Sequence, residues 1–443
     1  MKRRVVSALL CAAMVMSLVT GCGSKDDGKK EGGDDKQVLK VAAFEGGYGA
    51  DMWKEIEKAF EEVNPDVDVE MTVDKKIEDV ITPGMKSGDY PDVVHCATGR
   101  EAGLTETLTK EKGLEELTDV FSMEIPGEDA KVEDKLMPGF VGTMATNPYG
   151  DDATYYAPMF YGPCGLFYNA GLLEEKGWKV PTTWDEMWEL GEKAKAEGIA
   201  LFTYPTTGYL QEFMFSVIYS VGGEELFKNA TTYADGVWES PEMAKVFDIM
   251  KKFAEYTEPT TVANANNENF TKNQQLILDN KAIFCPNGTW LPGEMAQAPK
   301  ADGFKWGFAA VPSTDGSSKG FSTSFIEQMW VPKEAENKEL AKEFVAFMYS
   351  DKAVDIFAKA GAAQPVAGVS EKLEGDNQTI YGVYDNGVTP VIGGFASTQP
   401  VEGANMAETL FGTYNSIVSG DKTVDDWKAA TEEVSDLFRA AMK

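Results

Sequence analysis

Histidine, cysteine and basic residues are scarce in this 443-residue chain. It has one histidine, five cysteines, and 41 Lys and Arg residues against 72 Asp and Glu, giving a formal net charge of -31. Phosphate backbones and anionic lipid head groups repel a chain this acidic, so we expect no nucleic-acid partner and no electrostatic binding to a membrane. The His and Cys spacing of a metal site is missing, as are the HExxH and GxxxxGK[ST] motifs. We therefore expect neither a metal nor another cofactor.

Long apolar runs are confined to the beginning of the chain. Three basic residues, Lys2 to Arg4, precede an apolar stretch at 5–19, and then come Val19, Thr20, Gly21 and Cys22. This order is typical of a secretory signal peptide, here residues 1–21, and the small residues before Cys22 resemble the lipobox of bacterial lipoproteins. We expect Cys22 to be lipidated and to anchor the protein outside the cytoplasm, at the cell membrane. A plain secreted protein with a stray cysteine is the alternative.

A polar tract without apolar bulk follows at 23–37, so residues 22–37 are predicted to be a lipid-bearing flexible tether. About 400 residues remain, which is too many for one ordinary core and favours two domains. Three further cysteines, Cys96, Cys164 and Cys285, are an odd number. The sequence leaves open whether two of them pair or all three are buried thiols.

The folded part opens with a pattern typical of an α/β layer. An apolar strand is predicted at 38–43, an amphipathic helix at 52–63, a second strand at 67–73 and a third strand from about residue 91. Strand, helix and strand in this order predict a parallel sheet, whose ligands bind at the carboxyl ends of the strands. Further helices are predicted after Thr183, which forms a capping box with Glu186, and near 340–348 and 427–441.

Several short segments together resemble one family, the extracellular solute-binding proteins of family 1 that serve ATP-driven carbohydrate importers. These segments are GDYPDV at 88–93, LFYN at 166–169, PTTWDEM at 181–187, NKA at 280–282, NGTW at 287–290 and KELAKEF at 338–344. Their order and spacing span nearly the whole mature chain. Within the family, the sequence around 160–163 and 287–290 is most similar to that of binding proteins for N-acetylglucosamine and its dimer.

The resemblance implies an α/β, two-lobed, periplasmic-binding-protein-like fold of type II, with a ligand cleft between the lobes. Three crossings between lobes are expected near 161–165, 322–327 and 361–366. One lobe would comprise 38–162 plus 326–361, and the other 164–323 plus 366–443. The implied partners are a carbohydrate ligand and the permease and ATPase subunits of an ABC importer, and we expect the protein itself to be a monomer and not an enzyme.

Candidate ligand contacts combine residue chemistry with this resemblance. A sugar site needs aromatic platforms for flat apolar ring faces and carboxylates or amides for hydroxyl groups. Trp290 is the preferred platform because a turn-like segment precedes it, whereas Trp184 and Trp188 on a capped helix are predicted to pack. The other candidates are Glu45, Tyr161, Arg100, Tyr209, Glu327, Gln364 and Phe395.

Two other functions remain open from the sequence. The abundant acidic residues allow a secreted glycoside hydrolase that uses two carboxylates, although most of them fall on predicted helix surfaces or in loops. A sugar-sensing surface lipoprotein without a transporter would carry the same binding site. The sugar itself is not specified by these patterns.

Overall fold

The computed structural model describes residues 36–98, 100, 102–396 and 401–442. Contacts separate the residues up to Lys36 from a compact unit, Gln37–Lys443, and the fold described here is that of this unit. The predicted signal peptide, Cys22 and nearly all of the tether lie outside the described residues. In the part described, no helix combines the length and the apolar character needed to cross a membrane.

One mixed sheet runs through the unit. Its strands in the described residues are β1 (Gln37–Phe44), β2 (Val67–Asp74), β3 (Val93–Cys96), β4 (Ala157–Asn169), β5 (Ala200–Phe202), β6 (Ala282–Gly288), β7 (Trp306–Ala309), β8 (Phe321–Trp330) and β9 (Thr389–Val391). The spatial order is β2-β1-β3-β8-β4-β6-β5, with β7 paired to β4 and β9 paired to β8. The predicted first three strands are confirmed, and β1 pairs in parallel with both β2 and β3.

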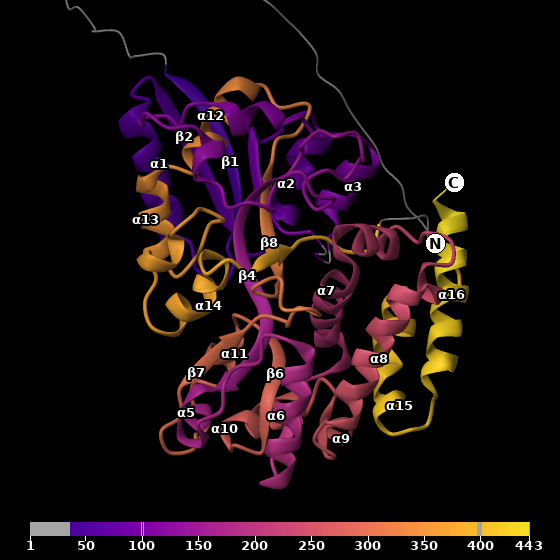
Figure 1. Ribbon diagram of the computed structural model, residues 1–443. Coiled ribbons are helices and arrows are strands. Elements are labelled where there is room, and N and C mark those ends of the chain that lie inside the picture. Colours follow the sequence, from indigo (N-terminus) through magenta and orange to yellow (C-terminus); the bar gives the residue numbers. More distant parts are fainter. Residues whose placement is uncertain (1–35, 99, 101, 397–400, 443) are drawn as a thin grey trace, which may run out of the picture. The chain divides into compact units, whose positions relative to one another are not determined.

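Two strands connect the two halves of this sheet. The amino-terminal part of β4 pairs with β8, whereas its carboxyl-terminal part pairs with β6 and β7 (Figure 1). At the other end, β8 pairs with β3. The strands β4 and β8 are antiparallel to each other. Each is long enough to contribute side chains to both packed cores. The first two predicted crossings, at 161–165 and 322–327, fall within these strands.

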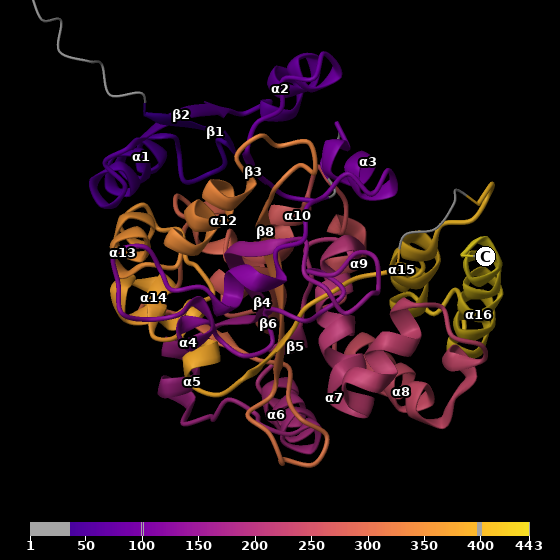
Figure 2. The same cartoon turned by 90° about the horizontal axis from the view of Figure 1, so that it is seen from above.

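The helices gather around the two cores (Figure 2). Those that precede the crossing in β4, or follow β8 up to residue 385, are α1 (Asp51–Val63), α2 (Ile77–Lys86), α3 (Leu104–Lys110), α4 (Val132–Lys135), α12 (Lys338–Phe347), α13 (Asp351–Lys359) and α14 (Asp376–Asp385). The others are α5 (Ala170–Lys176), α6 (Trp184–Ala196), α7 (Leu210–Thr231), α8 (Pro241–Glu255), α9 (Thr261–Asn264), α10 (Phe270–Leu278), α11 (Leu291–Glu294), α15 (Tyr414–Val418) and α16 (Val424–Ala441).

The first core joins segments that are far apart in sequence. Phe60 of α1 meets Phe344 and Phe347 of α12 with ring centroids 5.0 and 5.3 Å apart, and Trp53 of α1 meets Phe357 of α13 at 5.4 Å. All of these rings are buried. Burying several aromatic side chains at once stabilises this core strongly, since each removes a large apolar area from water.

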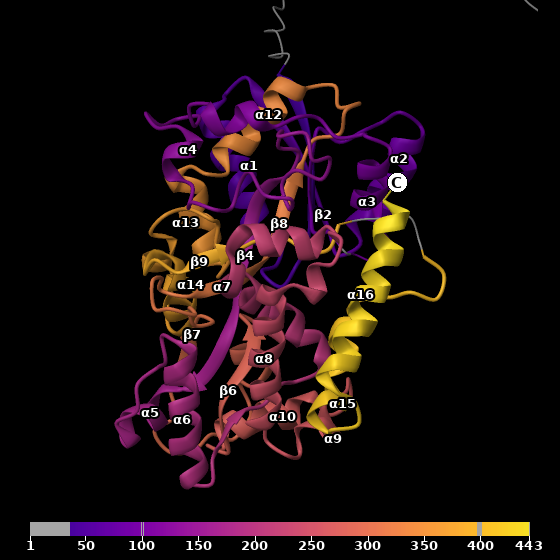
Figure 3. The same ribbon diagram turned by 45° about the vertical axis from the view of Figure 1, so that its right-hand side comes forward.

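The second core is formed by α6, α7, α8 and α16. The Thr183 hydroxyl accepts a hydrogen bond from the Glu186 N–H, which begins α6 as predicted. Trp184 and Trp188 stack on each other 5.4 Å apart, which confirms packing roles for both. Trp427 of α16 meets Phe247 of α8 at 4.7 Å, so the carboxyl-terminal helix lies against α8 (Figure 3).

The chain after the third predicted crossing divides between the two cores. Val366, Tyr381 and Tyr384 pack in the first core, whereas Phe395 and the aromatic residues of 410–438 pack in the second. The division of the chain into two lobes stays a proposal. The third crossing near 361–366 also stays a prediction, because α14 contributes to both halves: Tyr381 and Tyr384 pack in the first core, whereas Ile380 packs with Phe167 and Ile277.

Candidate functional site

Two loops of the second core carry an aromatic corner. Because β5 and β6 are parallel, the loops that follow them leave the same edge of the sheet. Tyr209 lies in the loop after β5 and Trp290 in the loop after β6, with ring centroids 6.1 Å apart at 65°. The Trp290 side chain is 39% exposed. An open indole face beside a phenol is the surface expected for a flat, partly apolar ligand.

A carboxylate is held next to this corner. Glu294 lies one helical turn after Trp290, and its Oε2 accepts a hydrogen bond of 2.8 Å from Nε2 of Gln274, a fully buried side chain. Burial and the charge of Glu294 raise the pKa of Tyr209, while a hydrogen bond from Trp290 acts in the opposite direction. The indole N–H, the phenol hydroxyl and the carboxylate are therefore close enough to contact one ligand.

The Trp290 ring covers a glycine of the sheet. A β-carbon added to Gly288 would lie 2.2 Å from ring atom Cη2, so the indole rests on the sheet face at this position. Gly288 pairs with Cys164 on β4, and Cys164 pairs with Thr323 on β8. Directly opposed residues of neighbouring strands project to the same face. Trp290 thus lies over the face that carries the Cys164 and Thr323 side chains.

Glu212 approaches the same row of the sheet from the first turn of α7. Burial raises the pKa of Glu212, while hydrogen bonds from Thr323 and Gln211 act against the rise. The Glu212 charge in turn contributes to a raised pKa of Cys164. Glu212 follows Tyr209 by three residues. It is close to Thr323 and Cys164, on the sheet face over which the Trp290 ring lies.

The first core contributes one acidic residue at the carboxyl end of β1 and another on the antiparallel strand β8. Glu45 follows β1, is about one-third exposed, and its Oε1 lies 3.9 Å from Nζ of Lys75. Glu327 lies on β8, and its carboxylate is near Gly46 in the loop after β1. The Glu327 Oε2 atom is 3.2 Å from Nε2 of His95. His95 is 1% exposed and packs against Trp53 and Phe160.

Hydroxyl groups link the two strand edges. Tyr48, in the loop after β1, lies close enough to Tyr381 of α14 to affect its pKa, and Thr289, the residue before Trp290, also affects the pKa of Tyr381. Burial raises the pKa of Tyr48. A β-carbon on Gly162 of β4 would also lie 3.0 Å from the Thr289 hydroxyl. The carboxyl ends of β1 and β6, which belong to different cores, therefore face each other.

Arg100 already has partners within the first core. Its Nε donates to Glu78 Oε2 at 2.8 Å, an Nη atom donates to the Lys75 carbonyl at 3.0 Å, and the guanidinium lies 3.8 Å above the Phe44 ring. These contacts fix the side chain beside the loop after β1. A ligand contact for Arg100 stays a prediction.

Tyr161 and Gln364 are enclosed by protein, and Phe395 is partly buried. Tyr161 is 1% exposed and packs against Phe140, Tyr381 and Tyr384, and its hydroxyl has no hydrogen-bond partner among the described residues. The Gln364 amide donates to the Met348 carbonyl, and Phe395 packs against Phe215 and Tyr233. We leave Gln364 and Phe395 out of the proposed site.

Sequence patterns missed Glu212, Glu294 and Tyr48. Glu212 and Glu294 follow the candidate aromatic residues Tyr209 and Trp290 by three and four positions, so helical spacing after each loop was the available signal. Tyr48 lies in the glycine-rich loop after the first strand. Its signal was this position, because ligands bind at the carboxyl ends of parallel strands. Nothing in the sequence pairs Tyr48 with Tyr381.

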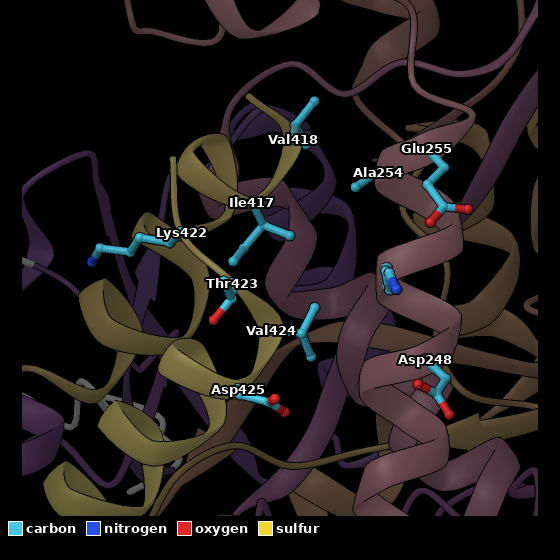
Figure 4. Close-up of a pocket in the computed structure, with 10 residues that line it drawn as sticks. Asp248, Ala254, Glu255, Ile417, Val418, Lys422, Thr423, Val424 and Asp425 are labelled. Atoms are coloured by element: carbon cyan, nitrogen blue, oxygen red, sulfur yellow. The ribbon is translucent and has the colours of Figure 1, made fainter. Parts of the chain in front are cut away.

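Other chemical groupings do not coincide with this region. Figure 4 shows a recess of about 480 Å³ between α8 and the α15–α16 turn, lined by charged and apolar residues such as Asp248, Lys251, Ile417 and Asp425. In the described residues, Asp235, Glu432 and Asp436 are close enough to share a cation, but Arg439 already pairs with all three. A GxSxG pattern, Gly316 to Gly320, lies in the turn before β8 instead of a strand-to-helix turn.

The three cysteines of the described residues are free and buried. Burial raises the pKa of Cys96 to about 12 and also raises the pKa of Cys164 and Cys285. The interpretation as three buried thiols, which the sequence had left open, therefore holds for the structure.

Two facing strand edges with an open aromatic corner define a two-lobed ligand-binding protein. The family model for the bacterial extracellular solute-binding protein matches residues 45–355. The chain therefore belongs to the family of bacterial extracellular solute-binding proteins. Members of this family bind solutes and are not enzymes, which confirms that part of the sequence-based prediction.

Relatives cover most of the chain. It is 25% identical to the diacetylchitobiose binding protein NgcE of Streptomyces coelicolor, over 99% of this chain and 96% of that protein. It is 26% identical to the diacetylchitobiose binding protein DasA of the same organism, over 82% of each chain. The apo-form of RafE from Streptococcus pneumoniae superposes with a TM-score of 0.67 at 18% identity, over 93% of this chain and 100% of that one. These similarities confirm the two-lobed α/β fold.

Proposed function

We propose that this chain is the substrate-binding lipoprotein of an ATP-driven importer that captures a saccharide between two lobes and delivers it to a membrane permease. The observation that carries the proposal is the exposed Trp290 indole, flanked by Tyr209 and by the Glu294 carboxylate that Gln274 holds. The two relatives named as diacetylchitobiose binding proteins make that disaccharide the first ligand to test.

The residue types suit a sugar. A pyranose ring presents a flat face of C–H groups that stacks on an indole, and its removal from water is favourable. Its hydroxyl and amide groups lie at the ring edge, where carboxylates accept charge-assisted hydrogen bonds worth about 1.5–3 kcal/mol each. Glu294 and Glu212 flank the aromatic corner, and Glu327 and Glu45 lie at the facing edge.

Capture by closure follows from the facing strand edges. A ligand shifts a protein towards the closed state only if it binds that state more tightly than the open one. A saccharide that contacts Trp290 on one side and Glu327 on the other meets this condition, since Trp290 follows β6, whereas Glu327 lies beside His95 of β3 and the loop after β1. Loss of either contact should then weaken both binding and closure.

Anchoring and energy supply complete the proposal. Cys22 would carry the lipid, and residues 23–37 would leave the folded unit free to reach a permease. The sequence holds no GxxxxGK[ST] segment, so ATP hydrolysis would be performed by partner subunits. Replacing Cys22 with Ser should release the protein into the medium, and continued retention at the membrane would contradict lipidation.

A thermal-shift screen tests the proposed ligand class. A ligand that binds the native state raises the melting temperature, by an amount that grows with its concentration over Kd. We expect diacetylchitobiose or another oligosaccharide to raise it, and Trp290→Ala to remove most of the shift. Trp188→Ala is the matched control, because its indole stacks on Trp184 and Tyr256 away from the corner. A shift produced by amino acids or peptides but by no sugar would overturn the proposal.

A further inference from the structure

Two aromatic side chains stand out by their exposure. Among the residues that the structure describes, Trp290 is 39% exposed and Phe325 is 47% exposed, and every other Trp, Tyr or Phe is more covered. Phe325 lies in the middle of β8, where the strand passes between the two cores. A large apolar side chain left open within a mostly buried strand needs an explanation.

The sheet register places Phe325 on the same face as the Trp290 ring. Phe325 is directly opposite Gly162, and Thr323 is directly opposite Cys164, which in turn is opposite Gly288. Residues two apart on a strand, and residues opposed across strands, project to one face. Trp290 covers Gly288, so the indole and the phenyl ring lie over neighbouring rows of the same sheet face.

Gly162 leaves the Phe325 ring open. A side chain at this position would project beside Phe325, and even a β-carbon would come within 3.0 Å of the Thr289 hydroxyl. Glu327 lies two residues after Phe325 on the same strand face, opposite Phe160. Glu212 lies near Thr323, on the same row as Gly288, which the Trp290 ring covers. One carboxylate therefore lies on the row of each exposed aromatic ring or next to it.

We propose that Phe325 is a second ligand platform, and that the ligand is an oligosaccharide of at least two pyranose units lying along this sheet face from Trp290 to Phe325. The inference rests on the proposed function. One unit stacks on Trp290 near Glu294 and Tyr209, and the next unit covers Phe325 with its polar edge towards Glu327 or Glu212. A bound sugar thus buries the phenyl ring that the protein leaves uncovered.

The separation of the two platforms sets the minimum length. Gly288 and Phe325 lie on strands two places apart, which is about 10 Å at the usual strand spacing. A further two residues along β8 separate the rows that hold Thr323 and Phe325. This distance exceeds the width of one pyranose ring, so a monosaccharide reaches only one platform.

Isothermal titration of the purified chain with N-acetylglucosamine, diacetylchitobiose and the corresponding trisaccharide tests the inference. We expect Phe325→Ala to weaken disaccharide and trisaccharide binding at least tenfold and to change monosaccharide binding less than twofold. Phe325→Tyr, which keeps an aromatic face, should retain most of the affinity. Leu437→Ala on α16, where Leu437 is 46% exposed, is the control and should change nothing.

The outcomes separate this inference from the proposed function. If Phe325→Ala leaves disaccharide affinity within twofold, or weakens the monosaccharide equally, Phe325 is not a second platform, even if Trp290→Ala still abolishes binding. Equal affinity of the unaltered chain for monosaccharide and disaccharide would also overturn the inference. If no saccharide binds and Trp290→Ala has no effect, the proposed function fails together with it.

Discussion

The Trp290 indole rests on Gly288, two residues earlier in the chain, and a β-carbon there would lie 2.2 Å from Cη2 of the ring. The absence of a side chain at Gly288 thus sets where the candidate platform lies. Because Trp290 is at the surface, its ring is free to move away from an added methyl group.

Gly288→Ala should therefore displace the indole without unfolding the protein. We expect sugar affinity to fall about tenfold, while the melting temperature of the free protein changes by only a few degrees, as for a loss of about 1 kcal/mol or less. Titration calorimetry and thermal denaturation measure the two effects. Gly293→Ala, where an added β-carbon meets nothing within 4 Å, is the control. An unchanged affinity would show that the position of the ring does not matter.

Glu212→Gln should stabilise the free protein at neutral pH. Burial raises the pKa of this carboxyl, so the folded state holds its proton more tightly than the unfolded state. The resulting cost of ionisation is absent below the ordinary carboxyl pKa and complete above the raised one. Glu212→Gln removes this cost while keeping a hydrogen-bonding side chain.

Thermal denaturation from pH 4 to pH 8 tests this sign. The melting temperature of Glu212→Gln should equal that of the unaltered chain near pH 4 and exceed it increasingly towards pH 8. A difference that is largest at pH 4 would contradict the assigned direction. If the carboxylate contacts sugar, the same variant should also lose affinity, most clearly at high pH.

Glu327→Gln should weaken sugar binding about tenfold. A charged acceptor contributes about 1 kcal/mol or more beyond a neutral one to a hydrogen bond, and 1.4 kcal/mol corresponds to tenfold in affinity. His95 and the loop after β1 remain in place because the amide has nearly the same shape. Glu339→Gln, on the exposed side of α12, serves as the matched control. Equal affinities of the two variants would remove Glu327 from the site.

The three buried thiols should resist alkylation in the folded protein. The nucleophile is the thiolate, and burial raises the pKa of Cys96 to about 12 and raises that of Cys164 and Cys285 as well. Mass spectrometry after iodoacetamide treatment should find all three unmodified in buffer and all three modified in denaturant. A pair that stays unmodified in denaturant until a reductant is added would reveal a disulfide.

Local sequence patterns were enough to predict the α/β layer at the start of the folded unit. The alternating and helical periods of 38–73 predict β1, α1 and β2, because burial on one face imposes a period that survives in any tertiary context. Trp290 became a candidate because a turn-like segment precedes it, and the family resemblance supported both Trp290 and Tyr209. The resemblance of short segments in a set order indicated the family.

Other features depend on how distant segments meet. In the sequence, Phe325 is one apolar residue among others of a strand. Its pairing with Gly162, which has no side chain, leaves the ring open to solvent. The link from Tyr48 through Tyr381 to Thr289 joins three segments separated by more than ninety residues each. Val366, Tyr381 and Tyr384 pack in the first core, whereas Ile380 between them packs with Phe167 and Ile277, a division that no local period specifies.

The chain's own patterns thus settle which segments become strands and helices and which loops carry aromatic and acidic side chains, since these follow from local periodicity and turn chemistry. Which of those side chains share one face, and which stay uncovered, was settled by strand register and by the contact of two cores. A shift of one residue in the pairing of β4 with β8 would turn Phe325 to the opposite face without changing a single local signal.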